Sequence, residues 1–215
     1  MRKSVCLMTV CTLLGVGGSV HGAVYDLGYC FNGTDPTSTA PWLTASFDDR
    51  GSVGSAYLTL TSHLDVPSEY IAKFVFNINP FDSRSLTIKP LSGPAVFISV
   101  GENAKQIDGT AGAGFDVLLS FPTAQGQRFE GDGTVATFLI SMAGLDDSYF
   151  DYPNTGSAQA IVGAAIQGIP QPGGGTISGD IMNGTTVPEP TTLLVWSGLG
   201  AIGAVMASRR KRRAA

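Results

Sequence analysis

The stretch Tyr70-Ile71-Ala72-Lys73-Phe74-Val75-Phe76-Asn77-Ile78 decides the fold class, because its side chains alternate in character. Every second position holds a large or apolar residue, namely Tyr70, Ala72, Phe74, Phe76 and Ile78. Polar Lys73 and Asn77 lie on the opposite face. A period of two residues is typical of a strand with one face on the core. The stretch therefore predicts a β-strand, and the turn signal Asn79-Pro80 ends it.

Further strands are predicted on both sides of this stretch, each bounded by glycine, proline or asparagine turns. They cover Ser52–Leu64, Ser85–Lys89, Ala95–Val100, Phe115–Phe121, Val135–Met142 and Ala160–Ile169. A slip in the alternation near Ser55 predicts a β-bulge in the first of them. No window in the body shows a long helical period with caps. Short strands joined by tight turns are typical of an antiparallel β-sandwich, which we predict for residues 24–169.

The charge of this body differs from that of the whole chain. Residues 24–186 contain 16 Asp and Glu but 6 Lys and Arg, a net charge of about −10, whereas the whole chain has −4. The difference arises because the remaining basic residues lie at the two ends of the chain. An acidic body argues against nucleic acid and against anionic lipid as partners.

The N-terminal segment 1–23 has the pattern of a signal peptide. Met1-Arg2-Lys3 is a short basic region, and an apolar run from Val5 to Val20 follows it. Small residues suit cleavage after Gly22 or Ala23. The alternative is a retained N-terminal anchor, but glycines interrupt the apolar run before it reaches spanning length. We therefore expect export, with Cys30 as the only cysteine of the mature chain and no internal disulfide.

Residues 170–187 are predicted to form a linker. Pro170-Gln171-Pro172-Gly173-Gly174-Gly175 and Asn183-Gly184-Thr185-Thr186 are rich in glycine, proline and polar residues, which is typical of a flexible spacer. Within this segment Ile177 and Ile181 could still pack as a last edge strand.

The last part of the chain combines three features in a fixed order. Val187-Pro188-Glu189-Pro190 comes first, and its two prolines predict an extended, accessible peptide. The uncharged run 191–208 follows, and its 18 residues give about 27 Å of helix, enough to cross the hydrocarbon core. Five basic residues close the tail: Arg209, Arg210, Lys211, Arg212 and Arg213. The positive-inside rule places them in the cytoplasm and the body outside it.

This tail resembles the PEP-CTERM sorting domain of exported bacterial proteins over about residues 187–213, with 188–213 as the sorting segment and 188–190 as its motif. The resemblance implies recognition by a membrane-embedded cysteine transpeptidase, the exosortase, which processes the chain near Pro188-Glu189-Pro190. Bacteria with such proteins commonly make extracellular polysaccharide. An ordinary tail anchor is the alternative. The body is also similar to a recurrent PEP-CTERM body type of unassigned function, through Leu58-Thr59-Leu60, Phe74–Pro80, Ala165–Ile169 and Gly173-Gly174-Gly175.

Candidate catalytic residues are few, and each has a simpler explanation. His63 is the only histidine after the leader, so a two-histidine metal site is excluded for the mature chain. The acidic pairs Asp48-Asp49, Glu130 with Asp132, and Asp146-Asp147 with Asp151 all fall in predicted turns. Glycoside hydrolysis or calcium binding could use such acids. We favour solvated turn acids, and expect no catalytic activity, metal or cofactor.

Two classes of function remain. The favoured one is a non-catalytic cell-surface or extracellular-matrix protein, anchored by a single membrane span until the exosortase processes it. The second is a carbohydrate-binding module of the exopolysaccharide matrix, in which Trp42 and Tyr152 would stack on sugars. Packing at the edge of the core is the simpler explanation of these rings. A secreted polysaccharide hydrolase ranks third, with Asp147 as its leading acid.

Overall fold

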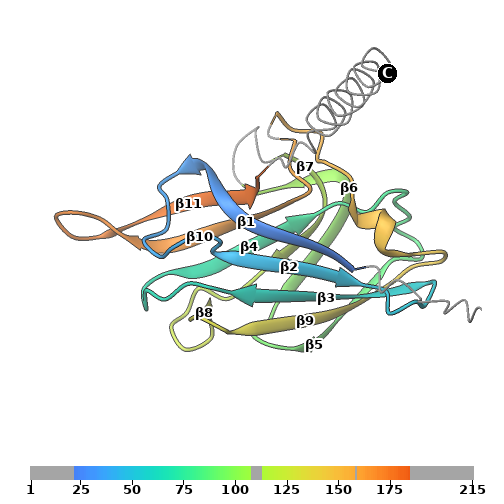
Figure 1. Cartoon of the computed structure of the whole chain (residues 1–215), viewed down its shortest axis with the longest axis horizontal. Coiled ribbons are helices and arrows are strands. Elements are labelled where there is room, and N and C mark those ends of the chain that lie inside the picture. Colours follow the sequence, from blue (N-terminus) through green and yellow to red (C-terminus); the bar gives the residue numbers. More distant parts are fainter. Residues whose placement is uncertain (1–21, 108–112, 158, 185–215) are drawn as a thin grey trace, which may run out of the picture.

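The strands account for nearly all of the regular structure. The computed structural model describes residues 22–107, 113–157 and 159–184 (Figure 1). Its strands are β1 (Gly22–Gly33), β2 (Leu43–Asp48), β3 (Ser55–Ser62), β4 (Tyr70–Phe76), β5 (Thr87–Ser92), β6 (Phe97–Gln106), β7 (Ala113–Ser120), β8 (Phe129–Glu130), β9 (Val135–Ser141), β10 (Val162–Pro170) and β11 (Thr176–Asn183). One 3-10 helix, η1 (Asp147–Phe150), is the only helix among the described residues. The all-β prediction is confirmed.

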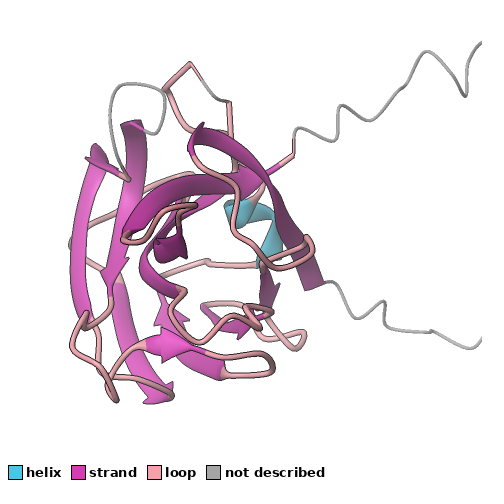
Figure 2. Cartoon of the chain, turned by 90° about the vertical axis from the view of Figure 1, so that its left-hand side faces the viewer, coloured by secondary structure: helices cyan, strands magenta, loops and turns pink. Residues whose placement is uncertain are grey.

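All of these strands belong to one antiparallel sheet. Its order is β5-β9-β3-β2-β1-β11-β10-β4-β7-β6, and β8 pairs with β4 beside this path. The prediction of a sandwich with two separate sheets was wrong, because a continuous ladder joins every strand. The sheet instead curls over its own core, and η1 lies inside the curl (Figure 2). Strong twist and several bulges allow a long sheet to bend in this way.

The stretch 70–78 contains β4 as predicted, but two of its side chains face the other side of the sheet than expected. Lys73 pairs with Ala165 and Ile71 with Ile166, so Ala72 has no partner on β10 and forms a β-bulge. Phe74 and Phe76 point into the main core as predicted. Ile71 joins them there, because the bulge reverses the alternation. Tyr70, predicted on the core face, therefore lies on the opposite side of the sheet.

Two clusters of buried side chains hold the sheet. The main core fills the curl, and in it the rings of Phe47 and Phe150 stack with centroids 4.2 Å apart. A smaller cluster lies on the other face and consists of Val75, Ile107, Phe115, Ala160, Ala165 and Met182. The central strands are therefore apolar on both faces, which explains the nearly continuous burial of β4 and β10.

β11 corrects the predicted linker. Residues 170–187 were predicted as a flexible spacer, but 176–183 form a central strand between β1 and β10. The glycines that suggested a spacer form the turn of the β10–β11 hairpin. In this turn Gly173, Gly174 and Gly175 have φ values of 101°, 97° and 86°. Such values favour glycine, so the run closes the turn between β10 and β11. The edge-strand alternative was also wrong, since β11 is paired on both sides.

The other predicted strands are present with ends shifted by at most three residues, except that β6 continues six residues beyond Val100, and β1, β2 and β8 were not predicted. β3 begins at Ser55 and keeps an unbroken register with β2 and β9, so no bulge occurs there. The expected slip reflects residues 52–54, which precede the strand. Within the described residues no helix is long and apolar enough to cross a membrane. The predicted span 191–208 lies outside the described residues, as does most of the predicted signal peptide.

Candidate functional site

The end of β11 is where the body meets the tail. Asn183 pairs with Leu27 of β1 and is buried. Its side-chain oxygen Oδ1 accepts hydrogen bonds from the backbone N–H groups of Ile161 and Val162, both at 3.0 Å. The last residue of the sheet is thus held by its neighbours on both sides. This fixes the point from which the tail leaves the body, at the upper side of Figure 1.

Only a few residues separate the end of β11 from the Pro188-Glu189-Pro190 motif. Gly184 is the last described residue, and Pro188 follows four positions later. Four residues of extended chain reach at most about 14 Å. The motif residues Val187, Pro188, Glu189 and Pro190 and the basic cluster 209–213 lie outside the described residues. The spacer expected over 170–187 is therefore reduced to the few residues after Asn183.

Asn183 offers a direct test of this attachment. We expect Asn183→Ala to lower the free energy of unfolding by about 2–4 kcal/mol, because one buried and one partly buried N–H group lose their acceptor. Asn183→Asp keeps an acceptor oxygen at the same place and should lose less stability than Asn183→Ala, although its charge is buried. Urea unfolding followed by tryptophan fluorescence measures both. An alanine variant as stable as the aspartate variant would contradict the role given to Asn183.

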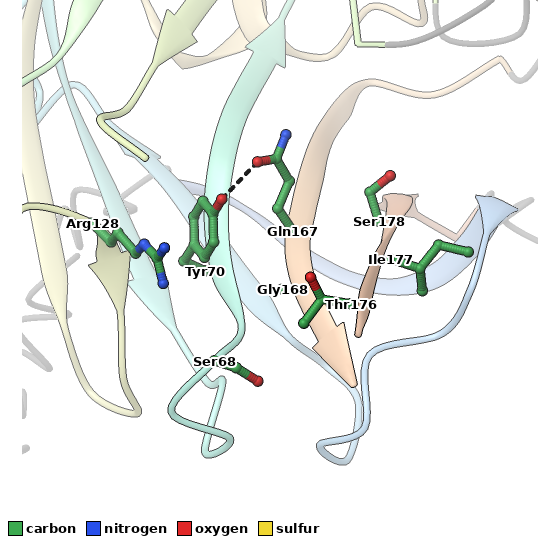
Figure 3. A pocket seen from close by; sticks show the side chains of 8 residues that line it. All are labelled: Ser68, Tyr70, Arg128, Gln167, Gly168, Thr176, Ile177 and Ser178. Atoms are coloured by element: carbon green, nitrogen blue, oxygen red, sulfur yellow. Dashed lines mark hydrogen bonds between the residues drawn. The ribbon is translucent and has the colours of Figure 1, made fainter. Parts of the chain in front are cut away.

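A polar groove lies on the outer face of the sheet, where the β10–β11 hairpin extends beyond β4 (Figure 3). It has a volume of about 500 Å³ and is lined by Ser68, Tyr70, Arg128, Gln167, Gly168, Thr176, Ile177 and Ser178. Pairing between β10 and β4 ends at Gln167 and Tyr70, whereas pairing between β10 and β11 continues to Pro170 and Thr176. The overhanging hairpin forms one wall of the groove.

Gly168 lets the two walls approach each other. Its φ is +81°, and a Cβ atom there would collide with the carbonyl oxygen of Ser68. The ladder between β10 and β11 is shifted at this point, so the strand is bulged beside the groove. Only glycine fits both the backbone conformation and the close approach. None of these groove residues was singled out from the sequence as a site.

The two candidate sugar-binding rings differ in their exposure. Trp42 is 5% exposed, and its Nε1–H donates to the carbonyl oxygen of Ser38 at 2.7 Å. Its indole is therefore part of the core, and the prediction that it contacts carbohydrate was wrong. Tyr152 is 43% exposed, so a sugar contact at this residue stays a prediction. The sequence could not separate the two rings because burial depends on the loop before β2.

This difference predicts unequal effects on stability. Trp42→Ala should lower the free energy of unfolding by about 3–5 kcal/mol, because it empties a buried site of a large ring. Tyr152→Ala should change it by no more than about 0.5 kcal/mol, as is usual for an exposed position. Urea unfolding midpoints give the comparison. Equal midpoints for the two variants would show that Trp42 is not a core residue.

His63 contacts two groups that could suggest a catalytic triad. Its Nε2 lies 3.0 Å from the Thr44 hydroxyl, and its Nδ1 lies 3.7 Å from Asp132. The Thr44 hydroxyl donates its proton to Asp26 at 2.8 Å. Because that proton is already used, Thr44 accepts a hydrogen bond from Nε2–H of His63. This is the reverse of the arrangement in which a histidine activates a hydroxyl nucleophile.

Three of the seven candidate acids fix turns. Asp146 accepts from the Ser148 N–H at 2.9 Å at the start of η1, and Asp48 and Asp49 accept from the N–H groups of Arg50 and Gly51. Asp147 and Asp151 instead border a hollow of about 550 Å³ beside Tyr25. Burial, followed by the nearby Asp151, raises the pKa of the Tyr25 phenol well above its usual range. No group of three possible metal ligands occurs among the residues that the structure describes.

Comparison with known proteins identifies the tail and leaves the body without a match. Residues 186–213 match the PEP-CTERM protein-sorting motif. The chain thus has the C-terminal signal of a PEP-CTERM protein, as its sequence predicts. No curated protein and no solved structure matches the chain.

Proposed function

We propose that this protein is exported and that its tail is a sorting signal processed by an exosortase. The observation that carries this proposal is the match of residues 186–213 to the PEP-CTERM motif. The structure adds support, because the last strand of the body ends at Asn183, just before the matched segment. The motif then follows the body directly, where a membrane enzyme can reach it without unfolding the sheet.

The proposed topology has two membrane signals. Segment 1–23 directs export, and cleavage after Gly22 or Ala23 leaves β1 paired with β2 from Val24 onward. Segment 191–208 then spans the membrane once, with the basic residues 209–213 in the cytoplasm. The body stays outside until the exosortase acts, and afterwards it belongs to the cell surface or the extracellular matrix.

The proposed role of the body is structural or adhesive and not catalytic. Support comes from the hydrogen bonds described above, which use the Thr44 hydroxyl proton and the side chains of Asp26, Asp48, Asp49 and Asp146 within the fold. We propose no cofactor and no metal for it. A net charge of about −10 suits a hydrated extracellular setting and argues against nucleic acid as a partner.

The experiment that tests this proposal is replacement of Pro188-Glu189-Pro190 by three alanines in the producing bacterium. Chains that keep residues 191–213 and remain in the membrane fraction support it. Chains shortened as in the parent would overturn it.

A further inference from the structure

We propose that the groove between β4 and the β10–β11 hairpin binds a sugar residue that carries a carboxylate, such as a uronate unit of an acidic polysaccharide. This goes beyond the sorting role and does not depend on it. The shape of the groove, its single charge and its other hydrogen-bonding groups all favour such a ligand.

The groove has the size and openness of a site for one unit of a longer ligand. Its volume of about 500 Å³ lies within the roughly 300–1,000 Å³ that small-molecule sites occupy. Its two walls come from different parts of the chain, with Ser68 and Tyr70 on one side and Thr176 to Ser178 on the other (Figure 3). The groove is open to solvent, so a polymer could enter it without displacing any strand.

Arg128 supplies the only formal charge that lines the groove. Its guanidinium carbon lies 4.1 Å from the centre of the Tyr70 ring, and its Nε–H donates to the Thr123 carbonyl oxygen at 2.8 Å. These two contacts hold the guanidinium in place before any ligand arrives. The side chain is 23% exposed, so the cation is largely shielded from water yet still accessible. A fixed, partly desolvated guanidinium binds carboxylates well.

Arg128 forms an ion pair with one acid, Glu130, but no hydrogen bond joins the two side chains. Oε2 of Glu130 lies 3.9 Å from Nη1 of Arg128, which is longer than a hydrogen bond. Glu130 is not among the lining residues, and no other Asp or Glu lines the groove. The N–H groups on the two terminal nitrogens therefore have no hydrogen-bond partner among the described residues. They remain able to donate to an incoming carboxylate.

The other polar groups of the groove match sugar hydroxyls. The Tyr70 hydroxyl donates to Oε1 of Gln167 at 2.7 Å, so the amide nitrogen of Gln167 points away from Tyr70 (Figure 3). Ser68, Thr176 and Ser178 each add a hydroxyl that can donate or accept. One cation among several neutral donors and acceptors favours a ligand with one carboxylate and many hydroxyls. A strongly anionic peptide lacks the hydroxyls that this lining would pair.

The test is titration calorimetry of the full chain, purified in detergent, with tetragalacturonate. Two further probes test the carboxylate and the sugar separately. The same oligosaccharide with its carboxylates methyl-esterified lacks the charge, and tetraglutamate lacks the sugar hydroxyls. We expect tetragalacturonate to bind at least about tenfold more tightly than either, because a charge-assisted hydrogen bond is worth about that factor or more. No binding, or equal affinity for the ester or for tetraglutamate, would overturn the proposal.

Two variants locate the binding in the groove. Arg128→Leu keeps a side chain near the Tyr70 ring but removes the cation, and should weaken binding at least about tenfold. Ser178→Glu adds a carboxylate at an exposed position, leaves the core untouched and should weaken binding similarly. Gln171→Glu is the matched control, because it adds the same charge to the same hairpin outside the groove. Equal affinities for the Ser178 and Gln171 variants would place the ligand elsewhere.

Discussion

A chain that stops after Gly175 is expected not to fold, whereas a chain that stops after Thr186 should fold like the complete protein. The two differ by β11 and the three residues after it, and both lack the tail. β11 is the strand that joins the two halves of the sheet, since β1 pairs with one side of it and β10 with the other. Without β11 the order breaks into β5-β9-β3-β2-β1 and β10-β4-β7-β6.

The expected loss is large because three contributions disappear together. Ile181 and Met182 are buried, and burial of such a side chain contributes about 1.5–3 kcal/mol. Asn183 no longer accepts from β10, and two ladders of backbone hydrogen bonds are lost. A domain of this size has a total stability of roughly 5–15 kcal/mol. The exposed edges of β1 and β10 would also promote aggregation.

Near-UV circular dichroism and thermal unfolding measure this difference. The chain ending at 186 should show a cooperative transition within a few degrees of the parent. The chain ending at 175 should show none and should be recovered mainly as aggregate. A cooperative transition for the shorter chain at the parent's temperature would mean that β11 is the dispensable spacer which composition suggests.

Replacement of Pro188-Glu189-Pro190 by alanines is expected to abolish processing while leaving the body folded. The motif lies beyond the last strand, so no described contact of the sheet depends on it. Proline has φ near −65° and disfavours helix at the residue before it, so an extended peptide is what we expect the enzyme to recognise. Alanine favours helix and removes the carboxylate of Glu189. The unprocessed chain should accumulate in the membrane fraction at its full tail length.

The chain contains its own matched control for this replacement. Pro170-Gln171-Pro172 has the same spacing of prolines but lies at the β10–β11 turn. Its replacement by three alanines should leave processing unchanged, because the turn is away from the tail. Loss of processing in both variants would mean that unrelated substitutions in the C-terminal part of the chain also block processing. The motif would then have no special role.

Alternation in the sequence was enough to predict most strands, including β4 and β10 despite their bulges, whereas β1, β11 and the short strand β2 were not predicted. β9 and β3 alternate between core and surface, so the sequence locates them nearly to their ends. β1 has two register shifts against β11, so its apolar residues follow no simple period. β11 contains Gly179 and lies between glycine-rich segments, which gave it the composition of a linker.

The tail motif could be predicted from the sequence, whereas the groove could not. The tail motif is a local pattern, so the sequence alone is enough to name its residues. The groove has no local pattern, because Tyr70, Arg128 and Gln167 are brought together by pairing between strands distant in sequence. The bulge at Ala72, which turns Tyr70 toward the groove, depends on the partner strand β10. For Trp42 the sequence left core packing and sugar contact open for a similar reason, since only the fold determines which aromatic rings are covered.

The folded body ends with β11, and the proposed sorting signal begins just after it. Intact-mass measurement of the protein exported by its own bacterium tests this most directly. We predict a chain that has lost 1–22 or 1–23 and ends between residues 184 and 190, so that β11 is retained. A product that still carries residues 191–213, or one that ends before Asn183, would contradict the account.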